Sequence, residues 1–366
     1  MTFKITINQF SLADKGILAE KWQSLEKKSN YNVFLSWLWI GHWLDLVTDK
    51  LFLIEAYRDD EVVGLGFFVE KKRYALGFYP IKQWWLHRTG HQHQDQIWIE
   101  YNDFLLNSSI ADEVRKEMIE QVKIYSPSVK EYIIGLSSSS VLNEFSQNFS
   151  YQKNDIKTTG YLVDLTKIEK PFLTEVVSKN TRSQINRSKK LLCEQGGLSY
   201  QVVSEKDELL KLLPNIAKIH IDLWQNTLEG SGFDNAIFKK FHTQLIKHMI
   251  NQEVQISILS LNDEILGYLM NFVINNKVYF YLSAINKNKD NRIKTGLILH
   301  SEAIQHYLDQ GMSSYDFLGG EARYKQSLSN RRYSLAINSF FNNNLILQLE
   351  KKLKSIKLTF KLILAK

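Results

Sequence analysis

The chain has 366 residues, enough for two domains with hydrophobic cores, and its aromatic fraction of 12% argues against disorder. No uncharged apolar run reaches the roughly 18 residues that a membrane-spanning helix needs. The formal net charge of +7 suits phosphate-bearing ligands. The sequence carries no zinc-finger, RNP or basic-zipper pattern, so no dedicated nucleic-acid binding is expected. The single cysteine, Cys193, cannot form an internal disulfide, and the N-terminus lacks a secretory pattern, so a cytoplasmic location is expected.

Hydrophobic periodicity predicts the elements of the first half. Helices are expected at Ala13–Lys28, Trp37–Thr48 and Ile110–Tyr125. Strands are expected at Lys4–Gln9, Leu51–Tyr57, Glu61–Lys71 and Glu131–Leu136. The Ser-rich stretch Ser137–Ser140 has the composition of a turn and is interpreted as a loop.

The second half shows the same mixture of patterns. Helices are expected at Pro171–Gln195, Glu205–Gln225, Ala236–Asn251 and Gly296–Gln310. Strands are expected at Tyr200–Val203, Gln255–Leu261, Glu264–Ile274, Lys277–Ile285, Ser314–Leu318 and Leu335–Phe341. Proline is tolerated in the first turn of a helix, so Pro171 marks a helix start.

Two hairpin-like segments, Leu53–Phe68 and Ile256–Met270, resemble each other. In both, an apolar strand meets an acidic turn, and a Glu-apolar-apolar-Gly sequence then begins the return strand. Turn-forming Asp or Asn between alternating apolar runs is a hairpin signal. The equal spacing up to Gly64 and Gly267 favours two related α/β domains over a chance likeness.

The domain boundary is expected near Thr158–Pro171. We therefore predict an N-terminal domain at 1–165, a second domain at 166–345 and a C-terminal helix at 346–366. That last segment is basic and amphipathic, with lysines at 351, 352, 354, 357 and 361. Such a helix is a candidate for peripheral contact with a membrane surface or a partner.

The stretch from Asn262 to Lys325 carries the densest chemistry. It consists of a hairpin, an apolar strand, a polar loop, a helix opened by Gly296, and a strand leading into Tyr-Asp-Phe-Leu-Gly-Gly-Glu-Ala-Arg-Tyr-Lys at 315–325. A strand that feeds a helix N-terminus through a small-residue loop is a ready anion site, because backbone N–H groups point outward there. This combination suits a group-transfer enzyme that holds a phosphorylated cofactor.

The order of Gly267, Tyr281, Gly296 and the Tyr-Asp-Phe-Leu-Gly-Gly-Glu-x-x-Tyr-Lys motif resembles the GNAT acyltransferase superfamily. More narrowly, it is similar to the CelD/BioF2-like branch, which is related to the Fem-type aminoacyl-tRNA-dependent peptidyltransferases. The resemblance covers most of the chain, with its sharp motifs between about residues 179 and 330. It implies two tandem GNAT-like domains, each with a mixed, mostly antiparallel sheet flanked by helices. It also places coenzyme and catalysis in the second domain and assigns the first to the acceptor cleft.

The loop 286–295 and the helix start are the expected site of the donor. The resemblance implies acetyl-CoA or another acyl-CoA as co-substrate, held near Tyr281, Arg292, Lys294, Thr295 and Gly296. The superfamily has an Arg/Gln-x-x-Gly-x-Gly/Ala loop here, and only its final glycine is matched in this chain. Basic side chains near a helix N-terminus attract a pyrophosphate, and glycine lets the backbone approach it. The alternative is an exposed polar loop capped by Thr295.

The 315–325 motif supplies the candidate catalytic groups. Glu321 is the candidate base, because acyl transfer requires proton removal from the nucleophile. Lys325 is assigned to stabilise the oxyanion, the role that Fem-type relatives give to the lysine that ends this motif. Tyr324 is expected to donate a proton or stack on the ligand, and Asp316 to contact substrate. For each residue, a solvated charge or a packed ring remains the alternative.

Two helical patterns in the second half border the expected acceptor site. Asn180 and Arg182 match a basic Asn-x-Arg helix of the family and are expected to bind substrate, although a plain solvated helix face is the alternative. His220 and Trp224 lie one turn apart on a predicted helix. His220 is a candidate general base near neutral pH and Trp224 a candidate substrate contact, whereas a structural His–Trp pair is the alternative.

A histidine-rich loop, with His87, His91, His93 and Asp95, matches no standard zinc spacing. It is interpreted as a polar loop that lines the cleft, and no metal is expected anywhere in the chain.

The sequence as a whole predicts an acyl-CoA-dependent N- or O-acyltransferase. Relatives act in polysaccharide and cell-envelope pathways, so a sugar or sugar-nucleotide is the expected acceptor, attacking the thioester directly. Two alternatives remain: a Fem-like transferase that takes its donor from aminoacyl-tRNA, and a catalytically inactive GNAT scaffold.

Overall fold

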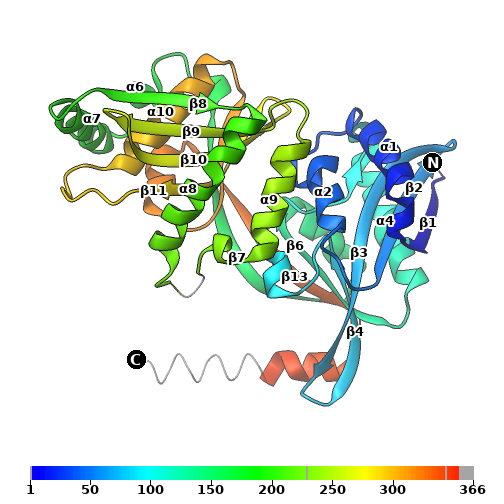
Figure 1. The fold of residues 1–366 in the computed structure, drawn as a ribbon. Helices are drawn as coiled ribbons and strands as arrows, with labels where there is room; N and C mark the ends of the chain where they lie inside the picture. The colour runs from blue at the N-terminus through cyan, green and yellow to red at the C-terminus, as the bar shows by residue number, and fades with distance from the viewer. Residues whose placement is uncertain (1, 228–229, 343, 354–366) are drawn as a thin grey trace. The chain divides into compact units, whose positions relative to one another are not determined.

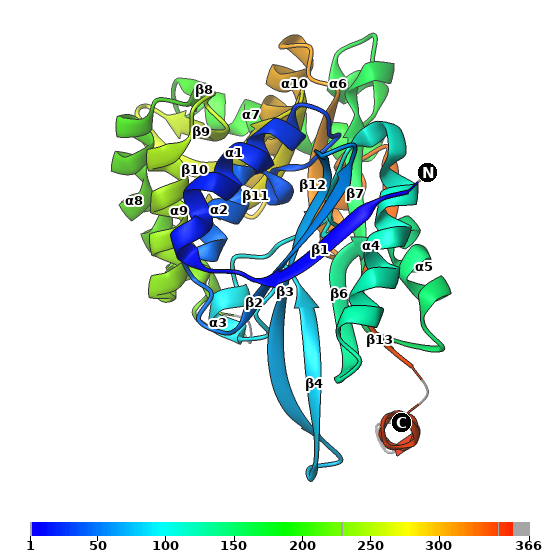
Figure 2. The ribbon, with the colours of Figure 1, turned by 90° about the vertical axis from the view of Figure 1, so that its right-hand side faces the viewer.

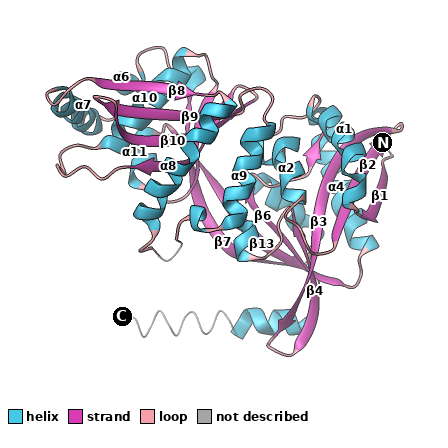
Figure 3. Cartoon of the chain, viewed as in Figure 1, coloured by secondary structure: helices cyan, strands magenta, loops and turns pink. Residues whose placement is uncertain are grey.

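The computed structural model describes residues 2–227, 230–342 and 344–353 (Figure 1). The chain divides into two compact units. Unit 1 comprises Met1–Lys157 and Leu335–Lys366, and unit 2 comprises Thr158–Ser334. Both units contain helices as well as strands (Figure 3).

Unit 1 is built on a mixed sheet with the strand order β1-β2-β3-β4-β6-β13. Its strands are β1 (Lys4–Gln9), β2 (Leu51–Arg58), β3 (Glu61–Ala75), β4 (Tyr79–Leu86), β6 (Val129–Ser138) and β13 (Arg331–Phe341), and the short β5 (Leu105–Leu106) pairs with β3. Its α-helices are α1 (Lys15–Glu26), α2 (Trp37–Leu44), α3 (Gln92–Asp95), α4 (Ala111–Tyr125) and α5 (Ser139–Asn148).

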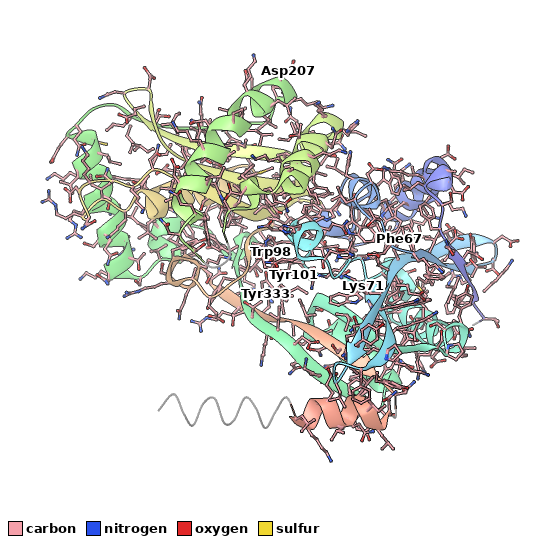
Figure 4. All side chains as sticks on the ribbon, turned by 60° about the horizontal axis from the view of Figure 1, so that its bottom comes forward. Phe67, Lys71, Trp98, Tyr101, Asp207 and Tyr333 are labelled. Carbon is pink, nitrogen blue, oxygen red and sulfur yellow. The ribbon has the colours of Figure 1, made fainter. Side chains whose placement is uncertain are left out.

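Helices cover both faces of this sheet (Figure 2). Successive side chains of a strand point to opposite faces, so Phe67 and Phe68 of β3 report on the two sides. Phe68 belongs to a core with Val114 and Met118 of α4. Phe67 (Figure 4) instead stacks on Trp22 of α1 with ring centroids 5.9 Å apart. The sheet is therefore sandwiched between α4 on one face and α1 on the other.

Unit 2 repeats this plan with the strand order β8-β9-β10-β11-β12-β7. Its strands are β7 (Tyr151–Asp164), β8 (Leu198–Val203), β9 (Val254–Leu261), β10 (Glu264–Ile274), β11 (Lys277–Ile285) and β12 (Ser314–Gly319). Its α-helices are α6 (Phe172–Glu175), α7 (Lys179–Cys193), α8 (Lys206–Trp224), α9 (Ala236–His248), α10 (Thr295–Asp309) and α11 (Arg323–Leu328).

Neighbouring residues of β11 show that this sheet is also covered on both faces. Phe280 packs edge-to-face on His300 of α10, with ring centroids 4.6 Å apart. The next residue, Tyr281, faces the other way and lies 5.1 Å from the ring of His242 on α9. Helix α10 therefore covers one face and α9 the other.

The two units share one topology. In each, four neighbouring strands pair antiparallel, and a helix then crosses over to a strand parallel to the fourth: β4-α4-β6 in unit 1 and β11-α10-β12 in unit 2. An antiparallel strand completes each sheet, β13 beside β6 and β7 beside β12. The predicted α/β fold of two related domains with mixed, mostly antiparallel sheets is confirmed.

Several predicted elements need correction. Ser137–Ser140 is not a loop. Ser137 lies inside β6, and the Ser138 side chain caps α5 by accepting a hydrogen bond from Val141 N. The predicted helix 171–195 is two helices, because Ser178 caps a new one by accepting from Thr181 N. Strands β4 and β7 were not expected.

The predicted ranges 1–165, 166–345 and 346–366, and the roles given to them, stay predictions. The units themselves change between Lys157 and Thr158 and again between Ser334 and Leu335. Residues 345–353 are helical, and residues 354–366 of the expected C-terminal helix lie outside the described residues. Among the described helices, none is both long and apolar enough to cross a membrane.

Candidate active site

The site begins where β11 and β12 part. These parallel strands pair at only three positions, from Lys277 with Ser314 to Tyr279 with Asp316. Both strands continue beyond this point, β11 to Ile285 and β12 to Gly319. Beyond Tyr279, the sheet edge of β11 on this side is therefore outside the β-ladder.

Helix α10 starts shortly after β11 and has an uncapped N-terminus. Its N-cap residue, Lys294, makes no side-chain capping bond, and the first intrahelical bond runs from Ile298 N to Lys294 O. The amides of Thr295, Gly296 and Leu297 have no hydrogen-bond partner within the described part of the chain. Thr295 is the buried first residue of the helix, so the alternative in which it caps the helix is wrong. Free amides at a helix start are the feature on which the predicted anion site rests, and anion binding here stays a prediction.

The loop before α10 is pinned to α7. The hydroxyl of buried Ser188 accepts a hydrogen bond from Lys294 N at 3.0 Å and lies 3.0 Å from Arg292 O. Arg292 forms a two-point ion pair with Asp290, with nitrogen–oxygen distances of 2.7 and 3.0 Å. These hydrogen bonds from Arg292 lower the pKa of Asp290 to about 2. The Arg292 side chain thus holds the loop, and the exposed Lys294 is the predicted basic group closest to the helix start.

The end of β12 presents an acid and an amine. Asp316 is buried and accepts hydrogen bonds from Leu318 N at 2.8 Å and from the Tyr333 hydroxyl at 2.6 Å (Figure 4). Lys325 is also buried, and its Nζ donates to Gly319 O at 2.7 Å. A buried ammonium therefore lies at the carboxyl end of the strand that parts from β11.

Glu321 and Tyr324 lie between the end of β12 and Lys325 in the sequence. Glu321 is exposed and accepts a hydrogen bond from the Tyr161 hydroxyl of β7 at 3.1 Å. Hydrogen bonds from Thr159 and Tyr161 lower the pKa of Glu321. The Tyr324 ring stacks on His300, with centroids 5.0 Å apart, and burial raises the Tyr324 pKa.

His300 was not predicted, although it lies one turn after Gly296 on the expected helix. Its Nδ1 is 3.3 Å from the Tyr315 hydroxyl. Burial and the positive charge of Lys325 lower the His300 pKa to about 3, so the ring is neutral at pH 7. The other contributors missed from the sequence, Tyr161 and Ser188, come from an unpredicted strand and an unremarkable helix position.

His220 and Trp224 join Tyr281 in a separate aromatic cluster. His220 stacks on Trp224 at 5.7 Å, and its Nδ1 lies 2.7 Å from Ser231 Oγ. Burial lowers the pKa of His220 to about 4. Further ring contacts run through Phe233 and Phe238 to Tyr281, at 5.5, 5.1 and 6.3 Å in turn. The structure thus brings predicted residues of α8 and β11 to one face of the sheet.

Asn180 and Arg182 lie in the first turn of α7. Asn180 is exposed, while Arg182 Nη1 lies 3.4 Å from Leu173 O and 3.3 Å from Thr174 O of α6. Their role as substrate contacts stays a prediction.

The histidine-rich loop is held by hydrogen bonds. His87 Nε2 accepts from Phe67 N at 3.0 Å, and His91 Nε2 lies 2.8 Å from Asp49 Oδ2. The described residues contain no cluster of three or more His, Cys, Asp or Glu side chains able to hold a metal ion.

Comparison with known families decides the fold family. Residues 179–326 match the model of the acetyltransferase (GNAT) domain. This segment is a GNAT domain. It contains the β11–β12 opening, the start of α10 and Lys325, so the expected acyltransferase of the GNAT superfamily is confirmed. Membership of the CelD/BioF2-like branch stays a prediction.

Solved structures with the same fold support a Fem-related architecture. FemX is 11% identical, with a TM-score of 0.61 over 94% of this chain and 99% of its own. L-PGS from Bacillus licheniformis is 12% identical, with a TM-score of 0.53 over 91% of this chain and 95% of its own. The C-terminal domain of a protein described as a lysylphosphatidylglycerol synthetase, from Agrobacterium fabrum, is 11% identical, with a TM-score of 0.56 and coverages of 92% and 95%. No curated protein matches the chain.

Proposed function

We propose that unit 2 transfers an acyl group from an acyl-CoA, with acetyl-CoA as the simplest donor, to an amine or hydroxyl. The N-terminus of α10 carries this proposal. The amides of Thr295, Gly296 and Leu297 are unbonded within the described chain, and the first turn of the helix contains no acid. Helix N-termini of this kind bind phosphate groups through N–H donors and the helix dipole.

The residues around these amides fit a diphosphate. A Cβ at Gly296 would lie 3.2 Å from Ile285 Cδ1, so glycine keeps the approach to the amides narrow but open. Lys294 is exposed and adds a positive charge. Because Arg292 is paired with Asp290, the backbone amides and Lys294 would hold the phosphates, in place of the superfamily's Arg/Gln-x-x-Gly loop.

Lys325 and Glu321 would support the transfer step. When bound, acyl-CoA supplies an activated thioester carbonyl. The Lys325 ammonium would stabilise the negative charge that develops on the carbonyl oxygen as the acceptor attacks. Glu321 would accept the proton that the attacking group loses, and its lowered pKa makes it a weak base that can pass this proton on. CoA would leave as the carbon–sulfur bond breaks, and its thiolate would take up the proton.

The acceptor is proposed to be a sugar or sugar-nucleotide of a polysaccharide or cell-envelope pathway, as the family resemblance implies. The half-exposed Trp224, stacked on His220, is a flat apolar surface suited to a sugar ring. His220 has a pKa of about 4, so it stays neutral during catalysis at pH 7 and acts as a hydrogen-bonding group.

Titration calorimetry with CoA and acetyl-CoA tests the proposal. Gly296→Asp places a carboxylate among the α10 amides, which favours the helix but repels a diphosphate. We expect the unchanged chain to bind both ligands and this variant to lose binding at least tenfold without a fall in melting temperature. Ser139→Asp puts the same charge at the exposed first position of α5 and should change nothing.

A second donor, aminoacyl-tRNA, is favoured by the Fem-related fold and the net charge of +7. Its signature would be tRNA binding that weakens steeply with salt, together with no response to CoA. That pair of results would overturn the acyl-CoA proposal. A chain that binds neither donor would be a catalytically inactive GNAT scaffold.

A further inference from the structure

The helical residues 345–353 are fixed to unit 1 by one face. Leu347 is buried in a small core with Ala75 and Ile81 of the β3–β4 hairpin. Glu350 pairs with Arg73 of the same hairpin, with an Nη2–Oε2 distance of 3.0 Å. The helix and the hairpin lie side by side in two views (Figures 1 and 2).

The opposite face of this helix is apolar and exposed. Leu345, Leu349 and Leu353 recur every four residues, which places them in one stripe, and they are 79%, 48% and 48% exposed. At the end of the adjoining hairpin, Tyr74 and Phe78 are 65% and 69% exposed. A group of exposed large apolar side chains marks an interaction site. We call these five residues the apolar rim.

The charges around the apolar rim are positive. Lys352 is exposed on the helix, whereas Lys351 Nζ donates to Gln152 O at 2.8 Å. Lys72, two residues before Tyr74 and on the same face of β3, is also exposed. Two copies of such a surface would repel each other, so the charge argues against self-pairing and for an anionic partner.

We propose that the apolar rim and its lysines dock unit 1 on an anionic phospholipid surface. The leucines and the two aromatic residues enter the headgroup region, while the lysines meet lipid phosphates. Positive charges next to an apolar helix face produce this mode of binding, and no membrane-spanning segment is needed. The inference does not depend on the acyl-transfer proposal.

Co-sedimentation of the full chain with lipid vesicles tests it. We expect binding to vesicles of phosphatidylglycerol and phosphatidylcholine, weakening with salt, and little binding to phosphatidylcholine alone. Leu345→Gln/Leu349→Gln/Leu353→Gln should reduce partition at least tenfold, because three apolar side chains are lost from the interface. Lys72→Gln/Lys352→Gln should reduce it about fivefold per lysine.

Matched controls separate docking from folding. Ile250→Gln removes an equally exposed apolar side chain from unit 2, and Lys239→Gln/Lys240→Gln removes two exposed lysines of α9. These variants should bind like the unchanged chain, and all variants should keep its melting temperature. Equal binding to both vesicle types, or unchanged binding of the triple leucine variant, would overturn the proposal. The proposal would also be overturned if the unchanged chain were a dimer that binds no vesicles and the triple leucine variant were a monomer, because the apolar rim would then join two copies.

Discussion

The two units share one topology, but different side chains lie where their two parallel strands separate. In unit 1, β4 and β6 part after Trp85 and Ile133, and the buried Asn102 spans the opening. Its Nδ2 donates to Leu86 O at 2.6 Å and to Gly135 O at 3.0 Å. In unit 2, the strand end is met by the Lys325 ammonium, which donates to Gly319 O. The neutral amide of Asn102 therefore bridges the two strands in unit 1, whereas a positive charge lies at the strand end in unit 2.

The crossover helices of the two units also differ in the charge of their first turns. Helix α4 of unit 1 carries Asp112 and Glu113 in its first turn, whereas α10 of unit 2 has no acid there and follows Lys294. Acids at a helix N-terminus stabilise the helix but repel an anion. The shared backbone plan therefore supports phosphate binding only where the first turn lacks acids, which is why we place the chemistry in unit 2.

The largest expected effect is the loss of stability in acid, and it should occur at different pH values in the two units. Burial lowers the pKa of His87 in unit 1 to about 4, and of His220, His242 and His300 in unit 2 to about 4, 4 and 3. The unfolded chain takes up these protons below pH 6.5, whereas the folded chain resists, so stability present above pH 6.5 is lost as the pH falls towards 4. At about 1.4 kcal/mol per pKa unit, each histidine costs about 3 kcal/mol.

Hydrogen exchange at stepped pH, resolved by peptide, measures this effect. Unit 2 should lose protection at a higher pH than unit 1 because it contains three of these four histidines. Simultaneous loss in both units would contradict the difference.

Next in size is Lys325→Met, which keeps the side-chain volume and removes the charge. If the ammonium stabilises the oxyanion, kcat should fall about 10²–10³-fold, a barrier change of about 3–4 kcal/mol. The loss of this charge should also raise the His300 pKa, which a histidine proton resonance would report. Arg323→Met, two residues earlier and exposed, is the control. A kcat within threefold of the unchanged enzyme would remove Lys325 from the mechanism.

Asn102→Leu should cost about 2–4 kcal/mol of unfolding free energy. The substitution leaves two buried carbonyls, those of Leu86 and Gly135, without their donor. Urea denaturation measures the change, and below the transition the turnover number should be unaffected. The exposed Asn154→Leu provides a neutral comparison. A drop in kcat at full folding would mean that unit 1 takes part in the chemistry.

The smallest effect is expected for Gly296→Ala. Its Cβ meets the flexible Ile285 Cδ1 at 3.2 Å, and alanine favours helix by up to about 1 kcal/mol, so stability should change little. The dissociation constant of acetyl-CoA should rise several-fold, because the methyl group narrows the approach to the amides. Gly16→Ala in α1 meets no atom within 4 Å and should leave binding unchanged. Unaltered acetyl-CoA affinity in Gly296→Ala would argue against this site.

Local sequence patterns predicted many of the helices and strands, and most of the missed elements depend on pairing between distant parts of the chain. Strict alternation predicted Lys277–Ile285 with its observed bounds. Strand β7 was missed because its first residues include Lys153, Asp155 and Lys157, which lack an apolar alternation. Serine favours both loops and helix N-caps, and Ser138 takes the second role where the first was expected.

In the candidate site, too, the residues within one local motif were predicted and the long-range partners were missed. Gly296 and Lys325 were recognisable because each lies beside a strand or helix end within a single motif. Tyr161, which bonds Glu321, lies 160 residues away in the chain, and that pairing depends on how β7 registers with β12. Sequence periodicity contains no information on such register across distant strands.

The division of the chain also has a consequence for biosynthesis. Unit 2 is one uninterrupted segment, whereas unit 1 needs β13, which is made near the end of translation. Domains tend to fold during synthesis as soon as their full sequence has left the ribosome. The nested unit 2 can therefore complete its sheet first, while the earlier-made unit 1 waits for its last strand.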